Sequence, residues 1–222
     1  MRAGKIGRRD YYIGRIGCEL KTVLSLCDRT GVFLRPWAEA GYRCIAVDIQ
    51  HKDTIERDGI MYVGADVRAY ALPPGEYAFC AAFPPCTDLA SSGARWFADK
   101  GLARLGEALI TVAACHALCE ATGAPYFIEN PVGRLSTCWR PFDYSFDPCE
   151  YGGYLDPPGG HYMKRTCLWA GNGFKMPVPR PVPADLGSMM HLMSPSADRA
   201  DKRSVTPAGF ARAVFEANHR CA

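Results

Sequence analysis

Short runs of apolar residues alternate with polar or turn-rich segments through the first half of the chain. The runs occupy residues 22–26, 44–47, 60–63 and 77–83. Each run has the length of a strand and lacks polar alternation, which is typical of parallel strands covered on both faces. Between the first two runs, residues 35–41 predict a short helix that Gly41 ends. The pattern therefore predicts βαβ units in an open α/β sheet, mostly parallel, with helices on both faces.

A helical period replaces the strand pattern between residues 100 and 121. There, apolar residues are separated by three, four and three positions, which is the spacing of one helix face. These residues are Leu102, Leu105, Leu109 and Val112. Strand-like runs follow at residues 126–129 and 166–169. A closing helix is predicted over residues 206–218, with Thr206 as its cap and Pro207 in its first turn.

The segment from residue 134 to residue 163 has a different character. It is dominated by Pro, Gly, Tyr and Trp and has no steady period, so we expect an irregular insert. No internal repeat divides the chain. We expect a single domain over residues 1–222, with residues 1–21 as an N-terminal extension.

Composition narrows the class of protein but not its partner. The 222 residues include 26 basic and 23 acidic side chains, and the net charge of +3 neither announces nor opposes nucleic acid. No uncharged apolar stretch approaches the roughly 18 residues of a membrane helix, and the basic start is not followed by a signal-peptide core. We therefore expect no membrane association and a cytoplasmic location. The odd number of cysteines, 11, predicts reduced thiols.

Acidic residues follow three successive predicted strands. Asp28 lies in the loop after the first strand with Gly31, Asp48 ends the second strand, and Asp66 follows the third. A carboxylate at the tip of the second strand can accept both ribose hydroxyls of a nucleotide, and Asp66 is placed to meet an adenine amino group. Each acid has a simpler interpretation as a helix cap, but their repetition favours a nucleotide-type cofactor site. The apolar residues Ile49 and Val67 complete the predicted site.

A rigid loop follows the fourth predicted strand. Pro84 and Pro85 precede Cys86 directly, so the prolines limit the backbone freedom around the thiol. A pinned cysteine at the end of a strand is well suited to act as a nucleophile. The alternative is an ordinary buried thiol at a strand end.

A carboxylate and an amide leave the next strand together. Glu129 follows three apolar residues and precedes Asn130 and Pro131. Partial burial raises the pKa of a carboxyl group and makes it a proton donor near neutral pH. A paired, structural glutamate is the alternative interpretation.

Four metal-ligating side chains surround the irregular insert. They are Cys138, Cys149, His161 and Cys167. They could hold a zinc ion that stabilises a segment with little core of its own. No tight pair such as Cys-x-x-Cys is present, so zinc is not the favoured interpretation and no metal is expected in the active site.

These segments, in this order, resemble the DNA cytosine-5 methyltransferase family, and its small phage-type members most. In that family, acidic strand ends bind S-adenosylmethionine, a Pro-Pro-Cys motif carries the nucleophile and a Glu-Asn pair supports the target base. Pro84, Pro85 and Cys86 match the nucleophile motif, and Glu129 and Asn130 match the base-binding motif. The likeness covers the chain from about residue 23 to residue 218.

The resemblance also implies a role for a later basic segment. Lys164 and Arg165 begin a strand that is similar to the family's basic strand, with Arg165 in the place of the arginine that contacts the flipped base. The implied activity is transfer of a methyl group from S-adenosylmethionine to carbon-5 of cytosine in DNA, through a covalent adduct on Cys86. Glu129 would stabilise charge at N3 of the ring.

Two departures from the family leave the substrate open. The cofactor loop keeps only Gly31 of the usual glycine-rich sequence, and only residues 170–203 lie where sequence-reading members carry a recognition domain. The chain could act on double- or single-stranded DNA, borrow specificity from a separate partner protein, or modify a cytidine nucleotide such as dCMP that needs no flipping. A non-catalytic module that binds the cofactor or nucleic acid is the other class of function.

Overall fold

The computed structural model describes residues 20–188 and 205–219, which build one eight-stranded sheet. The strands run in the order β3-β4-β2-β1-β5-β6-β8-β7. Their bounds are β1 Thr22–Leu26, β2 Arg43–Asp48, β3 Ile55–Arg57, β4 Ile60–Gly64, β5 Tyr77–Ala82, β6 Tyr126–Pro131, β7 Tyr144–Phe146 and β8 Thr166–Gly171. The central strands β4, β2, β1, β5 and β6 are parallel, whereas β3 and β8 pair antiparallel with their neighbours.

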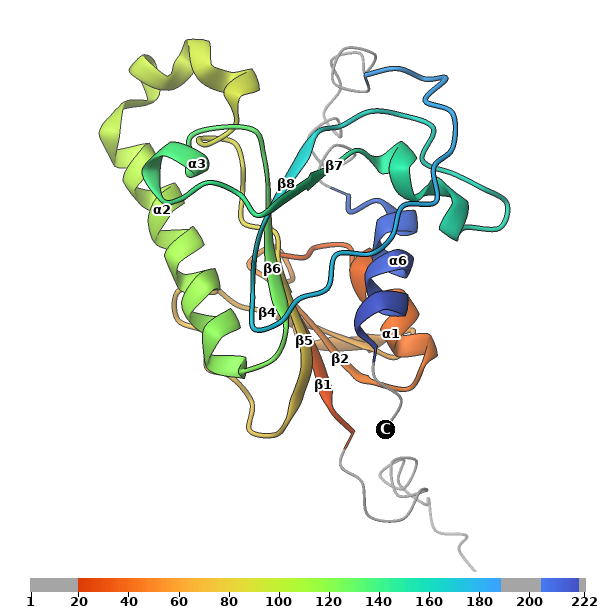
Figure 1. Cartoon of the computed structure of the whole chain (residues 1–222). Coiled ribbons are helices and arrows are strands. Elements are labelled where there is room, and N and C mark those ends of the chain that lie inside the picture. Colours follow the sequence, from red (N-terminus) through yellow and green to blue (C-terminus); the bar gives the residue numbers. More distant parts are fainter. Residues whose placement is uncertain (1–19, 189–204, 220–222) are drawn as a thin grey trace, which may run out of the picture.

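Helices cover both faces of this sheet (Figure 1). Their bounds are η1 Val32–Leu34, α1 Arg35–Glu39, η2 Ser91–Trp96, α2 Phe97–Thr122, α3 Leu135–Cys138, η3 Pro148–Tyr154 and α6 Ala208–Asn218. On one face, α1 and α6 bury an aromatic core in which Phe146 and Phe210 stack with ring centroids 3.8 Å apart. On the other face, α2 buries Val112, Cys115 and Cys119. The predicted fold class, an open and mostly parallel α/β sheet with helices on both faces, is confirmed.

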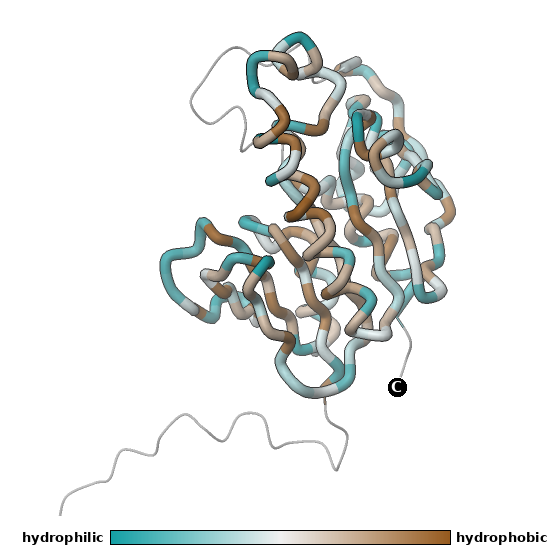
Figure 2. The backbone as a smooth tube through the Cα atoms, turned by 90° about the vertical axis from the view of Figure 1, so that its left-hand side faces the viewer, coloured by the Kyte–Doolittle hydropathy of each residue, from teal (hydrophilic) through white to brown (hydrophobic). Residues whose placement is uncertain are grey.

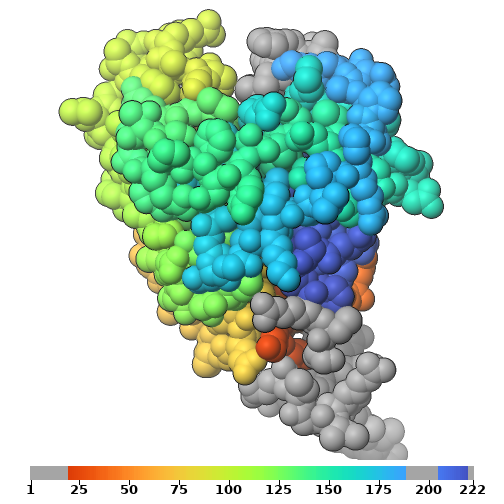
Figure 3. All heavy atoms as spheres, viewed as in Figure 1, coloured from red at the N-terminus to blue at the C-terminus, as the bar shows by residue number. Residues whose placement is uncertain are grey.

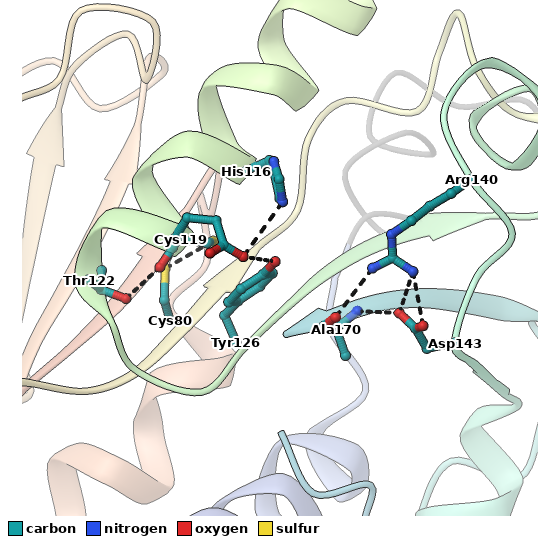
Figure 4. Close-up of polar contacts among 9 residues, drawn as sticks. Cys80, His116, Cys119, Thr122, Tyr126, Arg140, Asp143 and Ala170 are labelled. Atoms are coloured by element: carbon teal, nitrogen blue, oxygen red, sulfur yellow. Dashed lines mark hydrogen bonds and ion pairs between the residues drawn. The ribbon is translucent and has the colours of Figure 1, made fainter. Parts of the chain in front are cut away.

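Polar contacts hold α2 against the sheet and link Asp143 to β8, as Figure 4 shows. The Tyr126 hydroxyl donates to Glu120 of α2, and the Cys80 and Cys119 sulfur atoms lie 3.2 Å apart. Burial, together with Glu120, raises the pKa of Tyr126. Near β8, Asp143 accepts a 2.7 Å hydrogen bond from the Ala170 backbone nitrogen. These contacts hold the helix and the last strands in a defined register.

Four details differ from the sequence prediction. The closing helix begins at Ala208 with Pro207 as the N-cap residue, because Pro207 has an extended backbone (ψ 121°), so Thr206 lies outside the helix. Leu102 is 85% exposed, because this end of α2 passes beyond the sheet it would pack on. The segment expected to be irregular, 134–163, contains α3, β7 and η3. Both β7 and β3 span only three residues, too few to show a strand period.

The helical stretch Ser91–Thr122 is long and apolar enough to cross a bilayer by length and composition. The sequence prediction concerned uncharged runs only, and charged residues such as Glu107 and Glu120 interrupt this stretch, so the two statements do not conflict. In the fold, α2 packs on β5 and β6 through its buried residues, as a core helix does. Figure 2, which faces α2, shows apolar positions continuing along its outer side.

Candidate active site

The carboxyl ends of the parallel strands meet at one edge of the sheet, and a cavity of about 260 Å³ lies there. In open α/β sheets, ligands bind at this edge, where the strand order reverses. Here the order reverses between β1 and β5. The cavity is lined by Cys27 after β1, by Asp48, Ile49 and Gln50 at β2, by residues 65–68 after β4, by Pro85 and Asp88 after β5, and by Glu107, Ala108 and Thr111 of α2.

Asp48 presents a carboxylate that is only partly used by the protein. The residue is 7% exposed, and its Oδ1 accepts a 2.7 Å hydrogen bond from the Gln50 backbone nitrogen. Within residues 20–188 and 205–219, no hydrogen bond to its Oδ2 is found. Ile49 and Val67 line the same cavity with apolar side chains. A buried carboxylate with an open acceptor position can bind hydroxyl groups of a ligand.

Asp66 also lines the cavity, but its carboxylate already has a partner. The Arg68 guanidinium donates to both carboxylate oxygens, with 2.6 Å between Nη2 and Oδ2, and holds the pKa of Asp66 below its usual range. Arg68 also bonds Glu107 of α2 over 2.8 Å. The sequence alone does not predict this pair, because Arg68 and Glu107 belong to segments 39 positions apart in the chain. An adenine amino group would have to share Asp66 with Arg68.

Asp28 and Gly31, also predicted at the cofactor, shape the loop after β1. The buried carboxylate of Asp28 accepts hydrogen bonds from the backbone nitrogens of Thr30 (3.0 Å) and Gly31 (2.8 Å) and from Ser25 Oγ (2.7 Å). Gly31 has φ +65°, and an added Cβ would contact the Tyr62 ring. Neither residue is among those lining the cavity in the described part of the chain. Their contact with a cofactor stays a prediction.

The loop that carries Cys86 is tied to the neighbouring strand end. Ala82, which ends β5, pairs with Ile128 of β6, so the segments that follow leave the sheet side by side. The buried Asn130 side chain donates a 3.0 Å hydrogen bond from Nδ2 to the Pro84 carbonyl oxygen. Pro85 lines the cavity and Cys86 is exposed. The predicted nucleophile loop and the predicted Glu-Asn motif are therefore physically joined.

Glu129 lies beside a second, much smaller hollow of about 10 Å³. Phe83 from the Cys86 loop and Lys164 line the same hollow. Burial raises the pKa of the Glu129 carboxyl, and the charge of Lys164 lowers it by a smaller amount. The Phe83-to-Cys86 loop thus borders Glu129 at one end and the cavity with Asp48 at the other.

Arg165 is not among the residues that line the small hollow with Glu129. Its side chain is 56% exposed, its Nε is 3.2 Å from Asp147 Oδ2, and its Nη1 donates to Ser145 Oγ over 3.2 Å. The preceding residue, Lys164, is the cation that the fold places next to Glu129. The resemblance assigns the role to Arg165, and the sequence alone cannot show which of the two neighbouring cations faces Glu129, because the phase of the side chains depends on where β8 begins.

A second set of hydrogen bonds joins the segment after β5 to the segment after β6, further along the chain from both strands. Arg134 donates a backbone hydrogen bond to the Leu89 carbonyl oxygen (2.8 Å), and Ser91 donates one to Val132 (2.9 Å). Gly133 lies between them, with no room for a side chain against the backbone of Leu89 and Ala90.

Gly133→Ala is therefore expected to lower the free energy of unfolding by about 1–3 kcal/mol, because backbone atoms must move to admit the methyl group. Urea unfolding measures this change. The matched control is Gly106→Ala in α2, where the added methyl has open space and should stabilise the protein by up to about 1 kcal/mol. Equal effects of the two substitutions would contradict the close approach.

The zinc alternative gains no support from the fold. Within the residues that the structure describes, which include all four candidates, no group of three or more His, Cys, Asp or Glu side chains could hold a metal ion. Cys167 lies inside β8, where burial raises its pKa to about 11, and Cys138 is exposed on α3. His161 is close to Asp185 and the Pro183 carbonyl oxygen instead.

Comparisons with known proteins add little to the site. No protein-family model matches the chain. No curated protein matches it either. A solved structure from E. coli, described as a candidate DNA modification methyltransferase encoded within a prophage, is 14% identical with a TM-score of 0.43. The match covers 68% of this chain and 46% of that chain, so this protein spans less than half of that structure's length. Any functional assignment therefore depends on the side chains described above.

Proposed function

We propose that the protein is an S-adenosylmethionine-dependent methyltransferase that methylates carbon-5 of cytosine in DNA, with Cys86 as its nucleophile. One observation supports this most: Asn130 ties the Cys86 loop into a position between the Asp48 cavity and Glu129. Cofactor, thiol and acid would then meet at one edge of the sheet. Because all of these groups belong to one sheet, we propose a single catalytic domain.

The side chains around the cavity fit S-adenosylmethionine. Asp48 would accept the ribose hydroxyls through its open Oδ2, and Ile49 and Val67 would contact the adenine ring. The volume of about 260 Å³ is just under the roughly 300–1,000 Å³ of small-molecule sites, and the Arg68–Glu107 contact borders it. When bound, the cofactor supplies an electrophilic methyl group on a sulfonium ion.

The protein's own groups would prepare the base. The Cys86 thiolate adds to C6 of cytosine, which places electron density on C5 and on N3 of the ring. A protonated Glu129 then donates a hydrogen bond to N3 and stabilises that charge. Its raised pKa favours the protonated form that this role needs. Once C5 has bonded to the methyl group, loss of the C5 proton to a base and departure of the Cys86 thiolate from C6 restore the aromatic ring and complete the reaction.

Two basic residues would act around this acid. Lys164 lies close enough to Glu129 to lower its pKa, and is placed to orient the carboxyl or to contact the O2 atom of the base. Arg165, held by Asp147 at the surface, would reach the base only after leaving that ion pair. We therefore propose Lys164 as the nearer cation and keep Arg165 as a candidate for the flipped base. Pro131, after Asn130, would keep the strand exit rigid beside the base.

The substrate is tested by where a labelled methyl group goes. Protein incubated with methyl-labelled cofactor and either duplex DNA, single-stranded DNA or dCMP should yield 5-methylcytosine in DNA after digestion to nucleosides. Label in dCMP only would favour the nucleotide alternative. Cofactor binding without label in any substrate would favour a non-catalytic module, or the need for a separate specificity partner.

Asp48→Ala tests the cofactor site directly. Loss of an acceptor of two hydroxyl groups is expected to weaken S-adenosylmethionine binding about 10- to 100-fold, since hydrogen bonds to charged groups contribute roughly 1.5–3 kcal/mol. Titration calorimetry measures the affinity. Asp58→Ala, an exposed aspartate in the turn between β3 and β4, is the control and should bind like wild type. Unchanged affinity in Asp48→Ala would remove Asp48 from the site.

A further inference from the structure

A helical arm projects from the fold close to the proposed nucleophile. We define the arm as residues 91–104, comprising η2 and the first turns of α2. It begins shortly after Cys86 and rises beyond the strand ends at the upper left of Figures 1 and 3. The backbone contacts of Ser91 and Leu89 anchor its base to the exit of β6. The arm is therefore fixed at its base and exposed along its length.

Aromatic side chains of the arm lie against arginines, one on the arm itself and one, Arg134, at the start of α3. Trp96 is 52% exposed, and the Arg95 guanidinium lies 5.1 Å from its ring centroid. The Arg134 guanidinium lies 3.5 Å from the centroid of the Phe97 ring. These are cation–π contacts, which orient the guanidinium groups along the ring faces.

The charge of these two arginines is not neutralised by any residue that the structure describes. Among residues 20–188 and 205–219, neither Arg95 nor Arg134 forms an ion pair. The other basic residues of the arm, Lys100 and Arg104, are paired with Asp88 at 2.8 and 3.4 Å. Asp88 offsets only one of these two cations and Asp99 is the arm's own acid, so the arm and its base keep a positive balance, with Arg95 and Arg134 beside Trp96 and Phe97.

We propose that the arm binds single-stranded DNA, with an unpaired base stacked on Trp96 and with Arg95 and Arg134 on the adjacent phosphates. An exposed indole ring offers a π face to a base, and the arginines complement the negative backbone. In a duplex, base faces are covered by their neighbours, so a stacking side chain favours unpaired nucleotides. This inference deepens the proposed function, because it names the form in which DNA reaches Cys86.

An apolar partner protein fits the arm less well. Leu102 is 85% exposed at the far end of the arm, but the more exposed aromatic residue, Trp96, is bordered by unneutralised arginine. Tryptophan and arginine are also enriched in protein interfaces, so what favours DNA is that these guanidinium groups have no acidic partner within residues 20–188 and 205–219 and that the arm begins shortly after Cys86. The DNA interpretation accounts for both the ring and the charge.

Binding of a labelled single-stranded oligonucleotide of mixed sequence, followed by fluorescence anisotropy without cofactor, tests the proposal. Trp96→Ala should weaken binding about tenfold, as expected from roughly 1–3 kcal/mol per stacked base. Trp96→Phe should retain most of the affinity because it keeps an aromatic face. Leu102→Ala, the control at an exposed apolar position of the same arm, should bind like wild type.

The arginines are tested by salt dependence. The logarithm of the affinity falls as the logarithm of the salt concentration rises. Arg95→Gln and Arg134→Gln should each make this slope less steep by about 0.7, the contribution of one phosphate contact in a single strand. Unchanged slopes, or an unchanged affinity in Trp96→Ala, would overturn the proposal. So would a duplex of the same sequence that binds more tightly than the single strand.

The DNA-binding test of the arm and the methyl-transfer test of the proposed function can fail independently. Loss of affinity in Trp96→Ala in a protein that labels no substrate would uphold the arm and reject the methyltransferase assignment. Methyl transfer that is equally efficient in Trp96→Ala and wild type, with equal DNA affinity, would do the reverse. Because Trp96 is half exposed, its substitution should leave the fold intact, and circular dichroism checks this point.

Discussion

Cys86→Ser should abolish methyl transfer and leave binding of S-adenosylmethionine unchanged. A serine hydroxyl is a far weaker acid than a thiol and cannot form the anion that adds to C6 of cytosine, so we expect a loss of at least roughly a thousandfold. Cys86 is exposed, and the cavity is lined by Pro85 rather than by the thiol. The substitution should therefore change the free energy of unfolding by less than about 0.5 kcal/mol.

The matched control is Cys138→Ser, which changes another exposed cysteine, on α3. It should transfer methyl groups at the wild-type rate. A second measurement uses DNA that contains 5-fluorocytosine, because fluorine at C5 cannot leave as a proton and the thioether therefore persists. Mass spectrometry should find the adduct on the Cys86 peptide of the wild type and of Cys138→Ser. An adduct in Cys86→Ser, or full activity in that variant, would assign the nucleophile elsewhere.

The sequence predicted the central sheet because its strands are buried on both faces. The run at residues 22–26 became β1 with the predicted bounds, and the neighbouring runs differ from the observed strands by a residue or two. A parallel strand that is buried on both faces appears in the sequence as a continuous apolar run, and a Gly or Pro after it marks where the strand ends. The peripheral strands β3 and β7 were missed because three residues held by pairing with a neighbour carry no period of their own.

The proposed site could be read from the sequence only where its members are neighbours in the chain. Pro84 and Cys86 share one loop, and Glu129 and Asn130 leave one strand, so each motif could be seen locally. The hydrogen bond between Asn130 and Pro84 joins residues 46 positions apart and could not be inferred from either motif. The same holds for the partnership of Arg68 with α2, which has no local signal in the sequence.

The second large effect is expected at Glu129. Glu129→Gln keeps the shape of the side chain but removes the acidic proton that would bond N3 of the base, so methyl transfer should fall about 100- to 10,000-fold. Cofactor affinity should not change, because Glu129 lies at the small hollow and not at the cavity with Asp48. Glu120→Gln is the control, since that glutamate bonds Tyr126 on the α2 side of the sheet.

The same substitution has an opposite effect on stability, and its sign follows from the pKa. Burial raises the pKa of Glu129 in the folded protein above that of the unfolded chain. Its contribution to stability is therefore complete below the unfolded carboxyl pKa of about 4.3 and is lost as the pH rises through the folded pKa. Glutamine does not ionise and escapes this loss, so the variant should gain stability relative to wild type as the pH increases.

Thermal melts of wild type and Glu129→Gln from about pH 4 to about pH 8 measure this difference. The gap in Tm should widen toward high pH in favour of the variant. Lys164 opposes the rise in pKa, so in a Lys164→Met background the loss should be larger at high pH, because the ionised carboxylate then lacks its nearest positive charge. A gap that stays constant with pH would mean that Glu129 is already ionised in the folded protein. A carboxylate of that kind could accept a proton from the base but could not donate one to N3, and the acid in the proposed mechanism would have to be sought at Lys164.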